Sequence, residues 1–349
     1  MPLLRTWLRT LLGAVLMALL TNAAAEATGW RWRNTSDRDQ GYLVFPVYRE
    51  QARSPEVVFL GSSLTRWGVQ ARLLEEELSL REGRPLEVWN LGVHGGTAPQ
   101  LREAGRIAFS KGAPRLLVVE ARPGFWNERR TDPSVLFYWR WFAPLDETLL
   151  GLLDRPWAWT EEGLVRAVFG ARALWRQGQF LLQPALAERW RKAELLDREE
   201  RGSFWPRSAV LEALRRPETV DEALWARALA RKEERLALLQ PFASGHAWRG
   251  VLEELVERCR AAGTRLVLFL PPVSGVLQEA MPPGLREAHL AWMQEVAGPE
   301  AVVLDLDPLG RRLGPAHWFD LDHLNARGAG ILSGELLPRL RGLLEEAPR

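Results

Sequence analysis

The pattern of apolar and polar positions predicts buried strands that alternate with amphipathic helices. Short, continuous apolar runs end in polar or glycine-rich turns at residues 57–60, 86–91, 116–120, 265–270 and 301–306. Such runs are typical of strands buried on both faces of a parallel sheet. Helical spacing of apolar residues occurs between and after them, at 65–79, 97–110, 248–262, 285–296 and 326–344. We therefore expect a three-layer α/β/α fold with a five-stranded parallel sheet.

This alternation is interrupted after the third strand. Residues 125–247 contain no apolar run of similar quality, but helical spacing recurs at 164–177, 185–200 and 220–239. We expect a large, mainly helical insertion here, with the α/β domain formed by residues 26–124 and 248–349. Ten of the 17 tryptophans fall between positions 126 and 248. Most would fill cores, and the others would stack on sugars, hold an acyl chain or face a membrane or partner protein.

The first 25 residues have the pattern of a secretory signal. Two arginines precede an apolar run at 11–20, and three alanines follow at 23–25. We expect cleavage after Ala25 and export to a bacterial periplasm or envelope. An uncleaved anchor is the alternative, although the apolar run is short for a bilayer span. Cys259 is the single cysteine, so no intrachain disulfide can form, and we expect its thiol to be buried.

Composition narrows the classes of function. The formal net charge is only +2, which does not favour a nucleic-acid partner. No HExxH or comparable ligand spacing occurs, so we expect neither a metal nor a cofactor.

Residues suited to nucleophilic catalysis follow the first and last predicted strands. Ser63 lies in the turn after the first strand, at the edge where open α/β sheets bind ligands. A serine hydroxyl becomes nucleophilic beside a base that a carboxylate orients. His323 precedes the last helix, and Asp320, three residues earlier, allows one loop to supply both groups. The alternatives are that Ser63 caps a helix, that Asp322 replaces Asp320, and that His317 replaces His323.

These blocks resemble those of the SGNH, or GDSL-like, hydrolases. Residues 61–64 (GSSL) resemble the nucleophile block, 90–92 (NLG) the second block and 320–323 (DLDH) the terminal D-x-x-H block. The resemblance implies a flavodoxin-like fold, a triad of Ser63, His323 and Asp320, and an oxyanion hole formed by the amides of Ser63 and Gly92.

The third block of that family supplies an asparagine, where this chain has the sequence EARPG at 120–124. Arg122 or Asn127 then remains as a further donor to the oxyanion. We expect Trp126 to contact the substrate, and for His94 either a place in the site or simple surface exposure.

This form of the blocks, with GSS at 61–63 and NLG at 90–92, is similar to that of envelope proteins that transfer or remove acyl groups on surface polymers, such as alginate acetyltransferase-like and teichoic-acid D-alanylation proteins. This implies an exported serine esterase or O-acyltransferase acting on acyl esters, most simply acetyl esters, of an envelope saccharide or a small ester. It also implies a membrane-embedded acyltransferase as a partner. The alternative is a catalytically inactive SGNH-like envelope protein that binds polysaccharide or a membrane partner.

Overall fold

The computed structural model describes residues 55–93, 95–127, 201–216, 218–237 and 246–347, together with Val44, Tyr48, Ala52 and Arg53. All of them belong to one compact unit, Arg38–Leu136 with Lys192–Arg349. The predictions for the signal segment 1–25, for His94 and for helices at 164–177 and 185–200 lie outside the described residues. Within those ranges, no helix has the length and apolar content that crossing a membrane requires.

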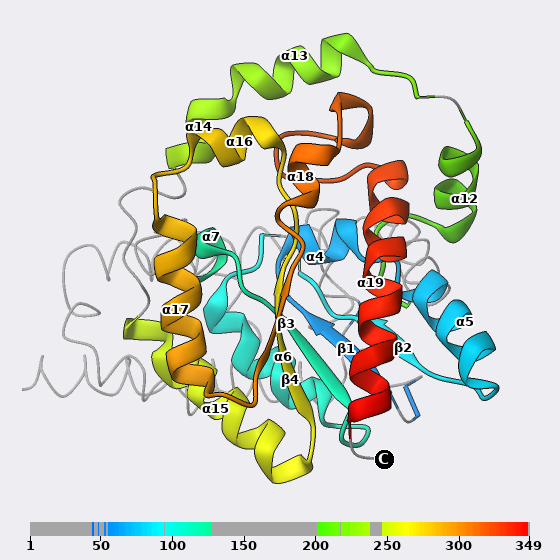
Figure 1. Ribbon diagram of the computed structural model, residues 1–349, viewed down its shortest axis with the longest axis vertical. Coiled ribbons are helices and arrows are strands. Elements are labelled where there is room, and N and C mark those ends of the chain that lie inside the picture. The colour runs from blue at the N-terminus through cyan, green and yellow to red at the C-terminus, as the bar shows by residue number, and fades with distance from the viewer. Residues whose placement is uncertain are drawn as a thin grey trace, which may run out of the picture. The chain divides into compact units, whose positions relative to one another are not determined.

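Five parallel strands form one sheet (Figure 1). They are β1 (Val57–Leu60), β2 (Val88–Asn90), β3 (Leu116–Glu120), β4 (Arg265–Leu270) and β5 (Val302–Asp305). Their order across the sheet is β2-β1-β3-β4-β5, and every pairing is parallel. This order is consistent with a flavodoxin-like fold. The prediction of an α/β fold around a five-stranded parallel sheet is confirmed.

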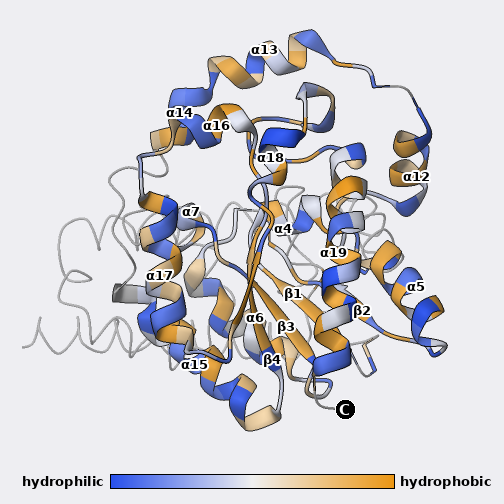
Figure 2. Cartoon of the chain, in the orientation of Figure 1, coloured by the Kyte–Doolittle hydropathy of each residue, from blue (hydrophilic) through white to orange (hydrophobic). Residues whose placement is uncertain are grey.

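Helices cover both faces of the sheet. Side chains of successive strand residues point to opposite faces, and Val57, Phe59 and Phe269 belong to one core cluster. Leucines from α5 (Ala71–Glu82) and α19 (Ala326–Glu346) join this cluster. On the other side, α15 (His246–Ala262) contacts both α6 (Leu101–Ala108) and α17 (Leu285–Ala297). Figure 2 shows the strands as a mainly apolar layer between these helices, as burial of both faces requires.

The register brings the carboxyl ends of the strands together. Phe59 pairs with Asn90, and Leu60 pairs with Val119. The turns that follow β1, β2 and β3 therefore lie at one edge of the sheet. Short helices in the connecting segments are η2 (Ala98–Gln100), α7 (Pro123–Trp126), α16 (Gly275–Ala280), α18 (Leu309–Arg312) and η4 (Pro315–His317).

Two of the predicted helices are each divided into two α-helices, and the segment predicted at 97–110 forms η2 and α6. The segment predicted at 65–79 forms α4 (Ser63–Gly68) and then α5, because the extended backbone of Val69 (φ −98°, ψ 118°) ends α4. The segment predicted at 220–239 forms α13 (Glu222–Ala230) and α14 (Lys232–Ala237). Apolar spacing identifies the buried face of a helix but continues across such breaks.

The last part of the predicted insertion packs against the sheet. The Asn90 N–H donates to the Arg201 carbonyl at 3.0 Å. Gly202 has a φ of 85°, and a Cβ there would lie 2.1 Å from the Asn90 carbonyl oxygen. α12 (Arg207–Arg215) then lies along α19 (Figure 1). The boundary at residue 247 stays a prediction, but residues 201–216 contribute to the surroundings of the carboxyl edge.

Candidate active site

Ser63 is the first residue of α4, directly after the turn that ends β1. The helix cap is Ser62, whose Oγ accepts a hydrogen bond from the Leu64 N–H at 3.1 Å. The alternative that Ser63 caps the helix is therefore wrong. Its hydroxyl is left available for chemistry.

The three residues predicted to form a triad lie together. Ser63 Oγ is 2.7 Å from His323 Nε2, although the two residues are 260 positions apart in the chain. His323 Nδ1 is 2.9 Å from Asp320 Oδ2. Both distances are within hydrogen-bonding range. The hydroxyl, imidazole and carboxylate thus form a continuous chain.

Backbone hydrogen bonds fix the loop that carries His323. Asp320 Oδ1 accepts from the N–H groups of Asp322 at 3.1 Å and His323 at 2.7 Å. The Phe319 N–H donates to the His323 carbonyl at 2.8 Å. Asn325 caps α19 by accepting from the Gly328 N–H at 3.0 Å. Asp320 therefore both shapes the loop and orients the imidazole, which explains the three-residue spacing.

The alternative residues occupy other roles. Asp322 Oδ1 lies 3.3 Å from His323 Nδ1, farther than the nearer oxygen of Asp320. His317 Nδ1 lies 3.0 Å from the Gly314 carbonyl, and its Nε2 lies 3.1 Å from Glu218. His323, rather than His317, is therefore the histidine positioned to accept the proton of Ser63.

Neighbouring charges favour the protonated form of His323. Burial lowers its pKa, but Asp322 and Asp320 outweigh burial and raise the pKa above the ordinary value. Burial alone would raise the pKa of Asp320, yet the hydrogen bond and charge of His323 hold it well below its usual range. The pair therefore stabilises the imidazolium that forms when a serine loses its proton.

Glu120, which the sequence analysis did not single out, lies beneath the nucleophile turn. It is the last residue of β3 and is fully buried. Its carboxylate accepts hydrogen bonds from the Ser62 N–H at 2.7 Å, the Ser62 hydroxyl at 2.8 Å and the Thr65 hydroxyl at 2.7 Å. Burial raises its pKa, while the bonds from Thr65 and Ser62 oppose that shift. Glu120 thus ties the turn before Ser63 to the end of β3.

Gly61 makes this close approach feasible. A Cβ at position 61 would lie 2.6 Å from Glu120 Oε2. The only sequence signal for Glu120 is an acidic residue at the end of an otherwise apolar run, and that signal does not identify its partners.

The structure does not support Gly92 as an oxyanion donor. The Gly92 N–H donates to Asn90 Oδ1 at 3.0 Å, and Gly92 does not line the pocket beside Ser63. The assignment of Gly92 is therefore wrong, because its N–H is already used. Gly95 does line the pocket, with a φ of 70°. Among the described residues its N–H makes no hydrogen bond, so Ser63 and Gly95 supply the candidate amides.

A pocket of about 90 Å³ adjoins Ser63 and His323. Leu64, Phe125, Val273 and Leu277 give it an apolar wall, and Glu120, Arg122 and Arg235 give it polar ones. An apolar cavity of about 150 Å³ binds benzene, which has six heavy atoms, so a pocket of this size suits a group of about three or four heavy atoms.

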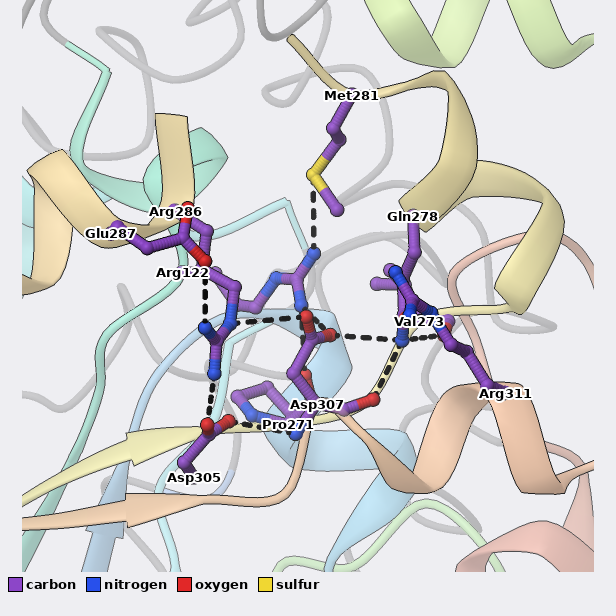
Figure 3. Close-up of polar contacts among 10 residues, drawn as sticks. All are labelled: Arg122, Pro271, Val273, Gln278, Met281, Arg286, Glu287, Asp305, Asp307 and Arg311. Carbon is purple, nitrogen blue, oxygen red and sulfur yellow. Dashed lines mark hydrogen bonds and ion pairs between the residues drawn. The ribbon is translucent and has the colours of Figure 1, made fainter. Parts of the chain in front are cut away.

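Arg122 lines the pocket, but its guanidinium contacts groups that do not line it (Figure 3). One nitrogen, Nη1, contacts Asp307 and the Pro271 carbonyl, the latter at 3.2 Å. The other, Nη2, lies 3.7 Å from Met281 Sδ. Asp307 lies 3.4 Å from Arg286 as well. Each terminal nitrogen of Arg122 thus contacts a residue outside the pocket lining, and none of these contacts supports the prediction of Arg122 as an oxyanion donor.

Two other predicted residues lie away from the pocket. Asn127 is buried and does not line it. Trp126 is fully buried, its indole N–H donates to the Glu120 carbonyl at 2.8 Å, and its ring packs on Trp292. The prediction that Trp126 contacts the substrate is therefore wrong, because the ring supports the end of β3 from within the core. Cys259 is buried as expected.

The His323 loop also groups potential metal ligands. Donor atoms of Asp320, Asp322 and His323 lie within 4.8 Å of one another. Ser63 and Asp320 already contact the two ring nitrogens of His323, so the geometry fits a triad. Comparison with known proteins adds no family to this interpretation: no family model matches the chain, and no curated protein is found as a relative.

Proposed function

We propose that the chain is an exported serine esterase or O-acyltransferase that acts on short acyl esters, acetyl esters above all, of an envelope saccharide or a related small ester. The observation that carries the proposal is the 2.7 Å contact between Ser63 Oγ and His323 Nε2, with Asp320 on the other ring nitrogen. The order of the sequence blocks and the strand order support an SGNH-like, flavodoxin-like fold as the framework.

In the proposed reaction, Ser63 Oγ attacks the ester carbonyl carbon while His323 Nε2 takes the hydroxyl proton. The N–H groups of Ser63 and Gly95 stabilise the negative oxygen that forms. The intermediate collapses, the alcohol leaves with the proton from His323, and an acyl-serine remains. Water then releases the acid in a hydrolase, or a sugar hydroxyl takes the acyl group in a transferase, and His323 serves as base again.

The test is covalent labelling by a fluorophosphonate probe. Wild type should be labelled, Ser63→Ala should not, and Ser208→Ala, which removes an exposed serine on α12, should be labelled normally. Asp320→Asn should lower kcat by about 10⁴-fold, because the imidazole loses its orienting carboxylate. Labelling that persists in Ser63→Ala would refute the assignment.

One observation favours a second candidate, a non-catalytic SGNH-like protein that binds polysaccharide or a membrane partner. Asp307, Pro271 and Met281 engage Arg122, which stands where the family has its third oxyanion donor. A wild-type protein that resists the probe and turns over no acetyl ester would support this candidate.

A further inference from the structure

Two partly exposed phenylalanines, Phe204 and Phe319, pack on the buried Trp67 beside His323, and we call the three rings the aromatic platform. Phe204 stacks on Trp67 with ring centroids 3.9 Å apart and an interplanar angle of 9°. Phe319 packs on Trp67 at 4.8 Å. Phe204 and Phe319 are 38% and 39% exposed, and they are the two aromatic residues among the exposed large apolar side chains of the described ranges. Grouped exposed apolar surface is typical of binding sites.

The platform is fixed to the catalytic loop. Trp205 packs edge-on against both Trp67 and Phe204, at 5.6 and 4.8 Å. Its indole N–H donates to the Leu324 carbonyl at 3.2 Å, one residue after His323. The rings therefore keep a defined position relative to the imidazole.

His323 lies between the platform and the pocket. Its ring is 4.9 Å from that of Trp67, and it also lines the pocket, whereas none of the three platform residues does. Trp67 is four residues after Ser63 in α4, which is about 6 Å along the helix axis. A substrate whose ester carbonyl lies at Ser63 can therefore also contact the platform.

The two sides of His323 suit the two halves of an ester. A pocket of about 90 Å³ holds little more than a short acyl group. The ester oxygen must lie next to His323 Nε2 to receive its proton. The alcohol half of the substrate therefore extends past the imidazole, away from the pocket.

The charged residues next to the platform favour a polar alcohol over an aliphatic one. Asp320 and Asp322 lie one and three residues after Phe319, and their side chains are 22% and 18% exposed. Arg235, which is 24% exposed, pairs with both of them. An aliphatic chain laid across these groups would strip water from charges without replacing its hydrogen bonds. A pyranose ring offers a flat C–H face for an aromatic ring and hydroxyl groups for the charged edge.

We propose that the aromatic platform binds the sugar ring that carries the ester or accepts the acyl group. This inference rests on the proposed function and specifies its alcohol half as a pyranose. Phe204 and Phe319 determine specificity here, since they touch the sugar while the reacting atoms lie at Ser63 and His323.

The test compares two acetate esters with the full-length protein: an O-acetylated methyl glucoside and ethyl acetate, which has no ring. Phe204→Leu and Phe319→Leu keep apolar bulk but remove the flat face. The ratio of kcat/KM for the glucoside to that for ethyl acetate should fall about three- to tenfold in each variant, mainly through KM. Leu80→Ala, which alters an exposed apolar residue on α5, should leave the ratio unchanged.

The outcomes separate this inference from the proposed function. A ratio that stays at the wild-type value in both variants, with ethyl acetate still hydrolysed, overturns the platform alone. An equal fall in kcat/KM for both esters also overturns the platform, because the rings would then serve only to support His323. Thermal unfolding of the variants would show any loss of fold. Wild type that turns over neither ester and resists the fluorophosphonate probe overturns the esterase and the platform together.

Discussion

At the scale of single residues, the proposed reaction of Ser63 depends on the charge of His323. Burial lowers the pKa of His323, but Asp322 and Asp320 raise it above the ordinary value of 6.5. A protonated imidazole cannot take the serine proton, so kcat/KM should rise with pH along an acid limb whose midpoint lies above 6.5. Asp322→Asn removes one negative charge and should move this limb to lower pH.

The measurement is the pH dependence of kcat/KM for a short acetate ester across the neutral and alkaline range. Glu345→Gln changes the net charge equally at a site near the end of α19 and should not move the limb. A limb at the same pH in wild type and Asp322→Asn would show that Asp322 does not control the imidazole.

Glu120 supports a second prediction at this scale. Its removal in Glu120→Ala leaves the Ser62 N–H and the hydroxyls of Ser62 and Thr65 without their buried acceptor. Each unsatisfied group costs about 1–3 kcal/mol, so the free energy of unfolding should fall by at least about 3 kcal/mol. Glu120→Gln keeps the shape but directs an N–H₂ toward these donors, and it should slow fluorophosphonate labelling of Ser63.

Urea unfolding and the rate of labelling measure the two effects. Glu212→Gln on α12, an exposed position, is the matched control and should change neither. Normal labelling of a stably folded Glu120→Gln protein would mean that Glu120 does not position the turn.

At the scale of elements, the strands were more predictable than the helices. β3 and β4 begin and end where the apolar runs do, because strands buried on both faces have few polar positions. The break between α4 and α5 could not be predicted from spacing, since it depends on the backbone at Val69.

The same distinction holds for the site. The place of Ser63 after the first strand, and the three-residue spacing of Asp320 and His323, predicted that these residues would meet, and the structure decided against Asp322 and His317. The contacts of Glu120 and the position of Gly95 at the pocket were not predictable, because they depend on which segments meet after folding. Gly92 and Gly95 are distinguished only by the folded structure, in which the Gly92 N–H donates to Asn90 and Gly95 lines the pocket.

The packing of residues 201–205 against strand β2 allows a prediction at the scale of elements. Gly202→Ala combines a φ of 85° with a Cβ only 2.1 Å from the Asn90 carbonyl oxygen. Backbone strain and overpacking together should lower the free energy of unfolding by at least about 2 kcal/mol and displace Phe204 from Trp67. Gly83→Ala, at a φ of 64° with open space around it, isolates the strain alone and should cost about 1–2 kcal/mol. Urea unfolding measures both variants. An equal fall in the free energy of unfolding would argue against tight packing of residues 201–205 on β2.

At the scale of the whole molecule, the pocket joins parts that lie far apart in the chain. Ser63 and Leu64 come from α4, Gly95 from the segment after β2, Phe125 from α7, Arg235 from α14 and Leu277 from α16. The size of the pocket is therefore set by how these elements pack together. No single motif sets it, and the sequence alone did not predict it.

The volume of about 90 Å³ predicts a strong preference for short acyl chains. An acetyl group has three heavy atoms and fits a pocket that is smaller than the roughly 150 Å³ cavity that binds benzene, whereas an octanoyl chain must leave the pocket or displace Leu277. Across ethyl acetate, butyrate and octanoate, kcat/KM should fall by at least about tenfold, a barrier increase of about 1.4 kcal/mol. Leu277→Ala should lose about 2–5 kcal/mol of stability yet narrow the gap between acetate and octanoate, because the missing side chain lengthens the pocket. Leu229→Ala, which truncates an exposed residue of α13, should keep the wild-type preference. Octanoate turned over as well as acetate by wild type would mean that the acyl chain lies outside this pocket, and that the pocket instead holds part of the alcohol.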